Sequence, residues 1–517
     1  MKSPTTMLQD LYGKIKREWK LAFCATVLLA LLVHMPILVS DIPNHDGLDS
    51  MYFDQNMITS GRWFLMIACG LSSFYSIPWV IGIIGIVLLG AAAAAITDIL
   101  EIKKPWAIVL CGGLLAVFPA LASTFAYVYT LDGYMLALLL AVLAVYFTKK
   151  YQKGFLAGGV CLAFSLGIYQ SYLPFAMILS VFSILLLAME ERSLKEKLRE
   201  GAGYLGMGVI GVSLYYIILQ VLLRLQGKEL ADYQGINGMT SGAGAEAGLL
   251  SMVRDMYVDF FKFTANGNVL WQNVISGGAL ILLAVSAAVA ALALVRRRKW
   301  WKNLLFFVII VLAVVILPLA SNVILLISPS VTYHLLMRYQ WVLYLMWLVA
   351  FAARYAEEMK RGAIVEWLAL AATVVLVFFY GVTDNIAYSN LQKRYEKTYA
   401  YCVRLLDRIE QTPGYYQGIP IAMVGVVGEE QYPATDITLP VTSGMIGMSG
   451  DSLLYTGENY RKFMRYYLGA TLNILPADAM QEMYYDEAYV KMDSFPGENS
   501  IKIMDGVMYI KTENVSR

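Results

Sequence analysis

Long apolar runs separated by short polar turns dominate the first 383 residues of the chain. A helix that crosses a bilayer needs about 20 mostly apolar residues. The pattern therefore predicts about eleven transmembrane helices. Their approximate ranges are 20–40, 76–97, 106–126, 132–148, 154–170, 172–189, 203–224, 272–295, 303–327, 335–353 and 363–383. No small-residue cleavage site follows the first run before Asp41, so we expect a retained helix and not a signal peptide.

Lys and Arg alternate strongly between the loops on the two sides of these runs. The loops on one side, with the N-terminal segment, hold 22 basic residues, and the opposite loops hold four, namely Arg62, Lys228, Arg254 and Lys262. Cytoplasmic loops carry the excess of basic residues in membrane proteins. We therefore expect a cytoplasmic N-terminus, an odd number of helices, and residues 384–517 outside the cell membrane.

The C-terminal part differs in charge from the rest of the chain. Residues 384–517 have a net charge of −5, whereas residues 1–383 have a net charge of +7. This predicts a soluble extracytoplasmic α/β domain at 384–517 beside a membrane domain at 1–383. We expect it to contain a helix from Leu391 to Gln411, a strand from Pro420, and a hairpin at Asp505-Gly506. The predicted fold class is mainly α and polytopic.

Composition agrees with the membrane assignment. Hydrophobic residues make up 59% of the chain and charged residues 15%, against about 25% charged in soluble globular proteins. The net charge of +2 and the dispersed basic residues argue against a nucleic-acid-binding protein. Five scattered cysteines build no disulfide framework.

The first outer loop, 40-SDIPNHDGLDSMYFDQNMITSGRWF, concentrates ionisable side chains just after the first helix. It contains Asp41, His45, Asp46, Asp49 and Asp54. Ionisable groups near membrane depth are costly and are therefore functional candidates. A partly desolvated carboxylate could accept a proton from a hydroxyl nucleophile. The alternative is a solvated acidic loop. The aspartates could also bind a divalent cation, although three histidines in the whole chain make no metal site.

Arg338, in 333-YHLLMRYQW, is expected one or two turns inside the tenth helix on the outer side. A guanidinium forks onto phosphate oxygens, so an Arg at this depth suits a lipid-linked phosphate. The alternative is an Arg that extends to the interface to reach water.

Two short outer turns, 125-FAYVYTLDGYM and 167-GIYQSYLPF, combine aromatic and polar side chains. Rings beside convergent polar groups suit a sugar site, because sugar C–H faces pack on rings and hydroxyls form hydrogen bonds. The alternative is an interfacial aromatic belt. The candidates here are Tyr129, Asp132, Tyr169, Gln170 and Tyr172.

Several familiar catalytic motifs are missing. The chain has no Asp-x-Asp, Gly-x-Ser-x-Gly, Walker-type Gly-Lys-Ser/Thr or His-Glu-x-x-His. The Gly-rich stretch 233-YQGINGMTSGAGAEAG follows no strand and matches no phosphate-binding spacing. An enzyme of this kind would receive its activated substrate within the membrane.

The runs 44-NHDGLDSMY, 60-SGRWF, 118-FPALASTFAYVYTLDGY and 167-GIYQSYLPF resemble the Gtr-type (GtrII-like) membrane glucosyltransferases. The resemblance implies a GT-C-like architecture in the bacterial cytoplasmic membrane, a polyprenyl-phosphate glucose donor and a surface glycan acceptor such as O-antigen. It also implies a flippase and a polyprenyl-phosphate glucosyl synthase as partners.

The resemblance further implies an essential carboxylate in the first outer loop. The matching position is Asp46, with Asp41 as a rival; His45, Asp49 and Arg62 would lie in the substrate site, and Arg338 would hold the lipid phosphate. The loop lacks the paired Asp-Glu of some related enzymes, which leaves open whether one carboxylate or two act.

The chemistry needs only one base and one cation, because the lipid phosphate is already a good leaving group. Single displacement would invert the anomeric centre. One alternative is a lipid or glycan transporter or flippase with a glycan-binding outer domain, but no internal repeat or mid-membrane charge favours it. A membrane O-acyltransferase would need a buried catalytic His, for which His34 is poorly placed beside Pro36.

Overall fold

In a computed structural model, the chain forms two compact units. The first comprises Met1–Leu38 and Phe53–Asp384, and the second comprises Val39–Tyr52 and Asn385–Arg517. The structure describes residues 3–231, 248–299, 304–328, 331–424, 439–442, 444–445, 448, 453–454 and 456–512. The Gly-rich stretch of the sequence analysis lies outside these residues except for Gly248. The second unit includes Val39–Tyr52, which the sequence analysis assigned to the membrane domain.

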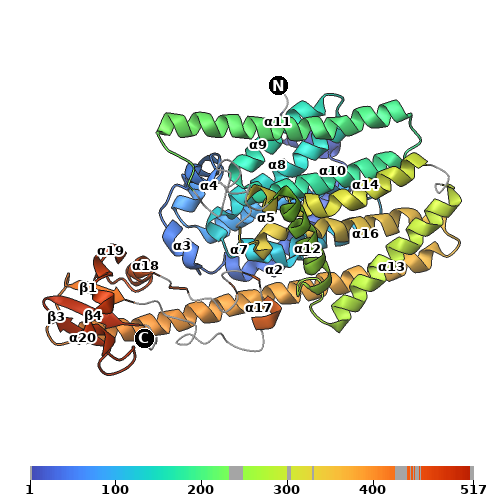
Figure 1. Cartoon of the computed structure of the whole chain (residues 1–517). Helices are drawn as coiled ribbons and strands as arrows, with labels where there is room; N and C mark the ends of the chain where they lie inside the picture. The colour runs from blue at the N-terminus through green and yellow to red at the C-terminus, as the bar shows by residue number, and fades with distance from the viewer. Residues whose placement is uncertain are drawn as a thin grey trace. The chain divides into compact units, whose positions relative to one another are not determined.

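Helices make up nearly all of the first unit (Figure 1). The longer ones are α1 (Pro4–Lys14), α2 (Arg17–Leu38), α4 (Leu65–Phe74), α5 (Pro78–Ile99), α6 (Pro105–Val117), α7 (Pro119–Phe125), α8 (Leu131–Lys150), α9 (Gly154–Ile168), α10 (Leu173–Met189), α11 (Leu194–Gln226), α12 (Leu249–Asn266), α13 (Val274–Arg297), α14 (Leu304–Ser321) and α16 (Trp341–Tyr355). Single turns are η1 (Ile58–Ser60), η2 (Val128–Thr130), η3 (Gln170–Tyr172), α15 (Ile324–Ile327), η7 (Leu335–Arg338) and η8 (Ala356–Glu358).

Each of the eleven predicted runs coincides with a helix or a broken helix. Within the described residues, eight helices are long and apolar enough to cross a membrane, and a ninth span is formed if α6 and α7 count as one. The runs 154–170 and 303–327 correspond to shorter apolar helices. The chain is therefore a multi-pass membrane protein by its helices, and the number of eleven spans stays a prediction. The predicted loop 41–75 contains an additional short apolar helix, α4.

Pro119 explains why the run 106–126 is broken. The axes of α6 and α7 differ by 46°. Proline has no N–H to donate to the carbonyl four residues earlier, which here belongs to Leu115. The Tyr339 hydroxyl donates to this carbonyl, and His34 Nε2 lies 2.7 Å from the next one, the Ala116 oxygen. His34 thus satisfies the backbone at a helix break, which is a structural use of a buried histidine.

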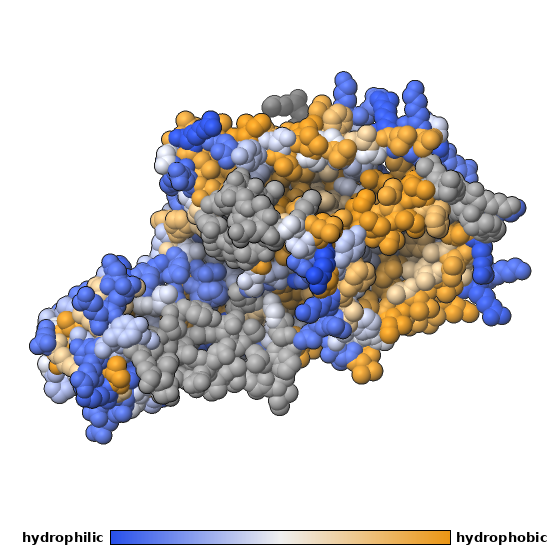
Figure 2. Space-filling model, viewed as in Figure 1, coloured by the Kyte–Doolittle hydropathy of each residue, from blue (hydrophilic) through white to orange (hydrophobic). Residues whose placement is uncertain are grey.

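Apolar side chains cover much of the helical unit, and hydrophilic ones concentrate towards its ends (Figure 2). Large aliphatic residues on several helices remain exposed, such as Leu32 (74%), Leu205 (73%) and Val274 (92%). Apolar surface on this scale is costly in water but compatible with lipid. This surface fits a unit immersed in a bilayer.

Ion pairs connect the loops that the charge pattern placed on one side. Asp98 pairs with Lys16 at 2.9 Å and with Lys150 at 3.1 Å, while Glu101 pairs with Lys149 and Arg354. Two further pairs join Lys104 to Glu366 and Arg298 to Glu358. The N-terminal segment and four of the basic loops therefore lie together at one end of the first unit.

Helix α17 (Gly362–Glu410) contains the boundary between the units. The sequence analysis treated 363–383 and Leu391–Gln411 as two separate helices, and this was wrong because α17 is continuous. No proline or glycine occurs between Asp384 and Glu410, so nothing in the sequence stops the helix before Pro413. The predicted C-terminal end is correct to within one residue.

The second unit contains a four-stranded sheet of order β2-β1-β4-β3. The strands are β1 (Pro420–Val424), β2 (Asn473–Ile474), β3 (Ile501–Met504) and β4 (Val507–Lys511), and the short helices are α3 (His45–Ser50), α18 (Gly457–Tyr467), α19 (Ala477–Met480) and α20 (Glu487–Val490). The predicted hairpin is confirmed: β3 and β4 are antiparallel, with Asp505 and Gly506 at positive φ. Strand β1 pairs in parallel with β2 and β4.

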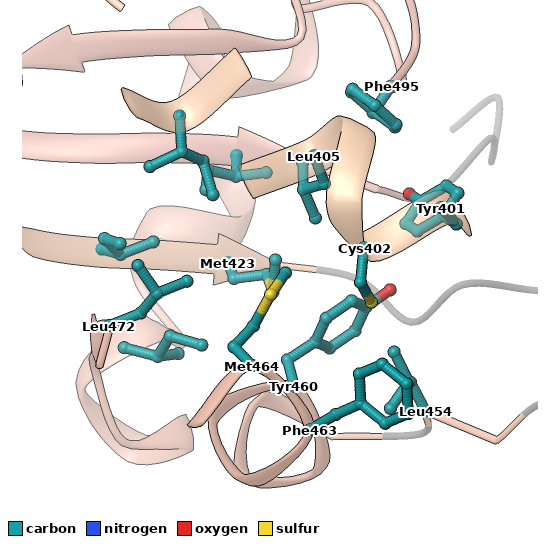
Figure 3. Packing of buried hydrophobic residues seen from close by; sticks show 14 of the residues in the cluster. Tyr401, Cys402, Leu405, Met423, Leu454, Tyr460, Phe463, Met464, Leu472 and Phe495 are labelled. Carbon is teal, nitrogen blue, oxygen red and sulfur yellow. The ribbon is translucent and has the colours of Figure 1, made fainter. Parts of the chain in front are cut away.

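A hydrophobic core holds this sheet against the C-terminal part of α17 and against α18. Figure 3 shows Cys402 and Leu405 of α17 facing Met423 of β1 and Tyr460 and Phe463 of α18. Leu48 of α3 is fully buried in the same core. The first outer loop is thus anchored in the C-terminal unit by apolar packing.

Candidate functional site

Helix α3 carries most of the ionisable side chains of the first loop. The Asn44 side chain caps it by accepting a hydrogen bond of 2.7 Å from the Gly47 amide. This cap fixes the chain direction so that Leu48 points into the core, while Asp46 and Asp49 remain accessible. Local capping and one buried leucine therefore position the acidic side chains.

Asp46 is accessible to solvent, as Asp41 and Asp49 are. Half of its side chain is exposed, and its Oδ1 lies 3.4 Å from His45 Nε2. An exposed carboxylate can reach a substrate hydroxyl without a change in the fold. His45 is close enough to orient it or to share a proton with it.

Asp49 is tied to α18. Asn459 Nδ2 donates to its Oδ1 at 3.0 Å, and Lys462 Nζ donates to its backbone carbonyl at 2.9 Å. Desolvation raises the pKa of Asp49, while Lys462 and the Asn459 hydrogen bond act in the opposite direction. These contacts make Asp49 a residue that fastens the loop to α18.

Asp41 lies in a different environment, at the start of the loop. Its residue surface is accessible overall, but the protein around its carboxyl group desolvates it and raises its pKa. The carboxyl group also acts electrostatically on the phenols of Tyr395 and Tyr467 in the same unit. A raised pKa suits a group that must accept a proton, so Asp41 stays a rival of Asp46.

Arg338, in the first unit, is buried and forms an ion pair. Its guanidinium donates two parallel hydrogen bonds to the Asp259 carboxylate, at 2.7 and 2.8 Å. It also lies 3.9 Å from the centre of the Tyr333 ring and 4.7 Å from that of Phe263. Arg338 is therefore not a snorkelling side chain, and a phosphate at this site would share or displace the Asp259 carboxylate.

The sequence analysis did not identify Asp259 as a candidate. It lies on α12, in the segment 257-YVDFFKF, and its only signal in the sequence was an acid within an aromatic stretch. Nothing in the sequence joined α12 to the turn that carries Arg338, 79 residues later.

An apolar cavity of about 500 Å³ lies among α12, α13 and α16. Phe260 and Thr264 line it from α12, and Trp341 from α16; the Trp341 ring centre is 5.7 Å from the Arg338 guanidinium. Small residues of α13, including Ala284 and Ala288, complete the lining. The cavity can hold an apolar chain with a polar end near Arg338.

The aromatic turns form a second group in the first unit, around Arg62. Arg62 Nη1 donates to the Tyr134 hydroxyl at 3.3 Å and lies 5.0 Å from the Tyr169 ring centre. The Tyr134 and Tyr169 rings stack at 4.4 Å. Turn η3, which contains Gln170 and Tyr172, also contacts turn η7 of Arg338. The structure thus brings the predicted turn 167-GIYQSYLPF next to turn η7, whose last residue is Arg338.

Gln170 is held by Tyr215 and by the backbone of η1. Its Nε2 donates to the Tyr215 hydroxyl at 3.0 Å and to the Ser60 carbonyl at 3.3 Å. Gly61 has φ +78°, and a Cβ there would lie 2.6 Å from the Tyr215 hydroxyl. Only glycine fits this turn, so Gln170 and Tyr215 are parts of a tightly packed support.

Asp132 and Tyr129 have local roles in the same unit. Asp132 is buried and accepts hydrogen bonds from the Ser72 hydroxyl and the Gly133 amide. The Tyr129 carbonyl accepts a hydrogen bond from Ser73. Both contacts hold α4 against the start of α8, which is a packing role visible only in three dimensions.

Asp384 is a second acid that sequence reasoning missed. It is fully buried in α17, and neither of its carboxylate oxygens has a hydrogen-bond partner among the described residues. Its signal in the sequence was an Asp at the end of the last apolar run, 381-GVTDN. A buried carboxyl group beside the membrane domain is a functional candidate.

In the part of the chain that the structure describes, no group of three or more His, Cys, Asp or Glu side chains could hold a metal ion.

The comparison with known families identifies the family of the chain. A family model described as "Glucosyl transferase GtrII" matches residues 35–353, more than half of the chain. The chain belongs to the GtrII glucosyl transferase family. This confirms the resemblance noted from the sequence. No curated protein and no solved structure matches the chain.

Membership in the GtrII family makes this protein a membrane glycosyltransferase, with a sugar donor and a glycan acceptor. The matched segment contains α3 with its aspartates, the Arg62 group and the Asp259–Arg338 pair. It ends before Asp384 and before all of the second unit except the first loop. The candidates for the shared chemistry therefore lie in the part shared with the family.

Proposed function

We propose that this GtrII-family protein transfers glucose from a polyprenyl-phosphate carrier to a cell-envelope glycan, such as an O-antigen-like polysaccharide, on the outer face of the cytoplasmic membrane. The observation that supports a lipid-linked donor is an apolar cavity of about 500 Å³, one of whose lining side chains, Trp341, lies 5.7 Å from the guanidinium of the buried Arg338. A nucleotide sugar would need a polar site, whereas an isoprenoid chain with an anionic head group needs an apolar cavity that ends near a cation.

In the proposed reaction, Arg338 binds the donor phosphate and Asp46 acts as the general base. The acceptor hydroxyl gives its proton to the Asp46 carboxylate while its oxygen forms a bond to the anomeric carbon. The bond from that carbon to the phosphate oxygen breaks, and its electron pair leaves with the phosphate. One displacement inverts the anomeric centre. No general acid is needed because the phosphate leaves as an anion.

The orientation of the protein in the membrane is part of the same proposal. The ion-paired basic loops at one end of the first unit would face the cytoplasm, with the N-terminus. The second unit, which carries the loop aspartates, would then lie outside. A flippase and a synthase of the polyprenyl-phosphate sugar would have to supply the donor on that side.

Replacing Asp46 with Asn tests the assignment of the base. We expect transfer to fall about 10²- to 10⁴-fold, the usual contribution of a general base. Purified protein would be incubated with undecaprenyl-phosphate glucose and a panel of cell-envelope polysaccharides, and products read by mass. Asp478→Asn, an exposed acid on α19, is the matched control and should retain the wild-type rate.

Asp41→Asn and Asp49→Asn separate the three loop acids. Asp49→Asn should keep most of the activity, because its contacts are structural. Full activity of Asp46→Asn together with inactivity of Asp41→Asn would show that Asp41 is the base. Absence of glucosyl transfer by the wild-type protein to any polysaccharide in the panel would count against the proposed donor and acceptor.

A further inference from the structure

The first outer loop and α18 form one framework in the second unit. Leu48 shares a core with Phe463 and Met464 of α18. Asn459 and Lys462, also on α18, hold the side chain and the carbonyl of Asp49. Any group on the adjoining face of α18 therefore keeps a fixed position relative to the loop carboxylates.

An exposed pair of tyrosines lies at this junction. Tyr52 ends the loop segment and Tyr466 lies one turn after Lys462 on α18; their ring centres are 5.1 Å apart and their planes are tilted by 50°. Half of the surface of Tyr52 and 37% of that of Tyr466 remain accessible. Two adjacent aromatic rings of this kind offer an apolar surface one helical turn from the contact between Lys462 and Asp49.

The backbone at Tyr52 is unusual. Its φ is +57°, in the left-handed region that residues with a bulky side chain rarely adopt. Such a conformation costs free energy and persists only where the surrounding structure enforces it. The fold thus holds an aromatic ring at the surface at some cost in stability, where a glycine would fit without strain.

A cluster of further rings lies on α17 and α18 in the same unit. Tyr467, next to Tyr466, stacks on Phe463 at 5.0 Å and contacts Tyr395 of α17 at 5.6 Å. Asp41 and Tyr52 both act electrostatically on Tyr467. Asp41, Tyr52 and Tyr466 are therefore gathered around one aromatic cluster.

We propose that the Tyr52–Tyr466 pair, on the same framework of α3 and α18 as Asp49 and Lys462, binds a pyranose ring of the acceptor glycan. The inference rests on the proposed function and adds a location for the acceptor. The C–H face of a pyranose packs on aromatic rings, and its hydroxyls bond to carboxylate and ammonium groups. The mixed charges of the surrounding side chains, with Arg465 5.7 Å from the Tyr466 ring centre, favour a hydroxyl-rich ligand over a strongly charged one.

The extent of the family match supports an acceptor site that is separate from the donor site. The matched segment ends at residue 353, so α18 lies outside the part shared with the family. Recognition of a particular acceptor is the function expected to differ among enzymes that share one donor chemistry. Tyr466 would then be a specificity residue contributed by the C-terminal unit to the first loop.

Direct glycan binding tests the site without turnover. Full-length protein in nanodiscs would be applied to a printed array of bacterial surface glycans. We expect wild type to bind pyranose-containing glycans, and Tyr52→Ala and Tyr466→Ala to bind them about tenfold more weakly. Tyr466→Phe, which keeps the ring, should bind nearly as wild type. Tyr416→Ala, at a tyrosine of the second unit that is 57% exposed, is the control and should be unchanged.

Two results would overturn the site: no glycan bound by the wild type, or equal binding by the wild type and both alanine variants. Kinetic measurements distinguish failure of the glycan-binding site from failure of the proposed reaction. Where transfer is measurable, Tyr466→Ala should raise the KM for the acceptor about tenfold and leave the KM for the donor unchanged. Glycan binding that depends on Tyr466, without any transfer by the wild type, would refute the proposed reaction and keep the binding site.

Discussion

Burial of a single carboxyl group sets a pH dependence that can be measured. Desolvation raises the pKa of Asp41 in the folded chain above its ordinary value. The folded state therefore holds the Asp41 proton more tightly than the unfolded state does. The free energy of unfolding is therefore higher at low pH, where Asp41 is protonated. It falls as pH rises from the pKa of Asp41 in the unfolded chain through its higher pKa in the folded chain.

We predict that Asp41→Asn removes this loss. As pH rises above the ordinary aspartate pKa of about 4, wild type should lose stability relative to the variant, because only the wild type must ionise a desolvated carboxyl group at position 41. Thermal unfolding of the purified protein in detergent as a function of pH measures the difference. Parallel curves for the two proteins would mean that Asp41 is well solvated, and would weaken its case as a rival base.

The pairing of α12 with η7 is the element-scale feature on which donor binding depends. Asp259 presents to Arg338 the same two-oxygen geometry that a phosphate would. The pair can therefore hold the guanidinium in position before the donor arrives. Both partners come from short segments beside the apolar cavity, so α12 contributes to the proposed head-group site and to the chain site.

Arg338→Ala should raise the KM for the polyprenyl-phosphate donor more than the KM for the acceptor. Arg338→Lys should rescue it only in part, because an ammonium group lacks the planar fork. Initial rates at varied donor and acceptor concentrations provide the measurement. An unchanged donor KM in Arg338→Ala would leave the ion pair as a purely structural contact.

A stability control accompanies this experiment. Removing one partner of a fully buried ion pair costs about 3–5 kcal/mol, since the other charge is left unpaired, and the cost here should be smaller because 28% of the Asp259 side chain is exposed. Asp259→Ala and Arg338→Ala should each lower the melting temperature, and the double variant should lose less than the sum. Kinetic comparisons are then made below the melting range of the weakest variant.

At the scale of the whole molecule, the proposed chemistry depends on sidedness. Tyr485→Cys places a thiol on an exposed turn of the second unit, and Lys103→Cys places one in a predicted cytoplasmic loop. A membrane-impermeant maleimide should label Tyr485→Cys in intact spheroplasts and Lys103→Cys only after permeabilisation. The unsubstituted chain, with its five native cysteines, gives the background. The opposite pattern would put the loop aspartates in the cytoplasm and refute outer-face transfer.

Sequence alone was sufficient for features that depend on local or repeated patterns. Apolar runs located the helices because a bilayer requires continuous apolar length, and Asp505-Gly506 located the hairpin because both positions need positive φ. The motifs of the first 175 residues were enough to indicate the GtrII family. Arg338 was recognised as unusual because charge within an apolar run is costly.

Only the tertiary structure decided which distant residues meet. Asp259 reaches Arg338, Asn459 reaches Asp49, and Leu48 enters the C-terminal core across separations that no period in the sequence encodes. A hydrogen bond or a buried contact depends on where whole elements pack, and packing is set by the sum of many side chains. The sequence therefore determined the membrane helices and the class of chemistry, and the fold determined that the first loop belongs to the C-terminal unit.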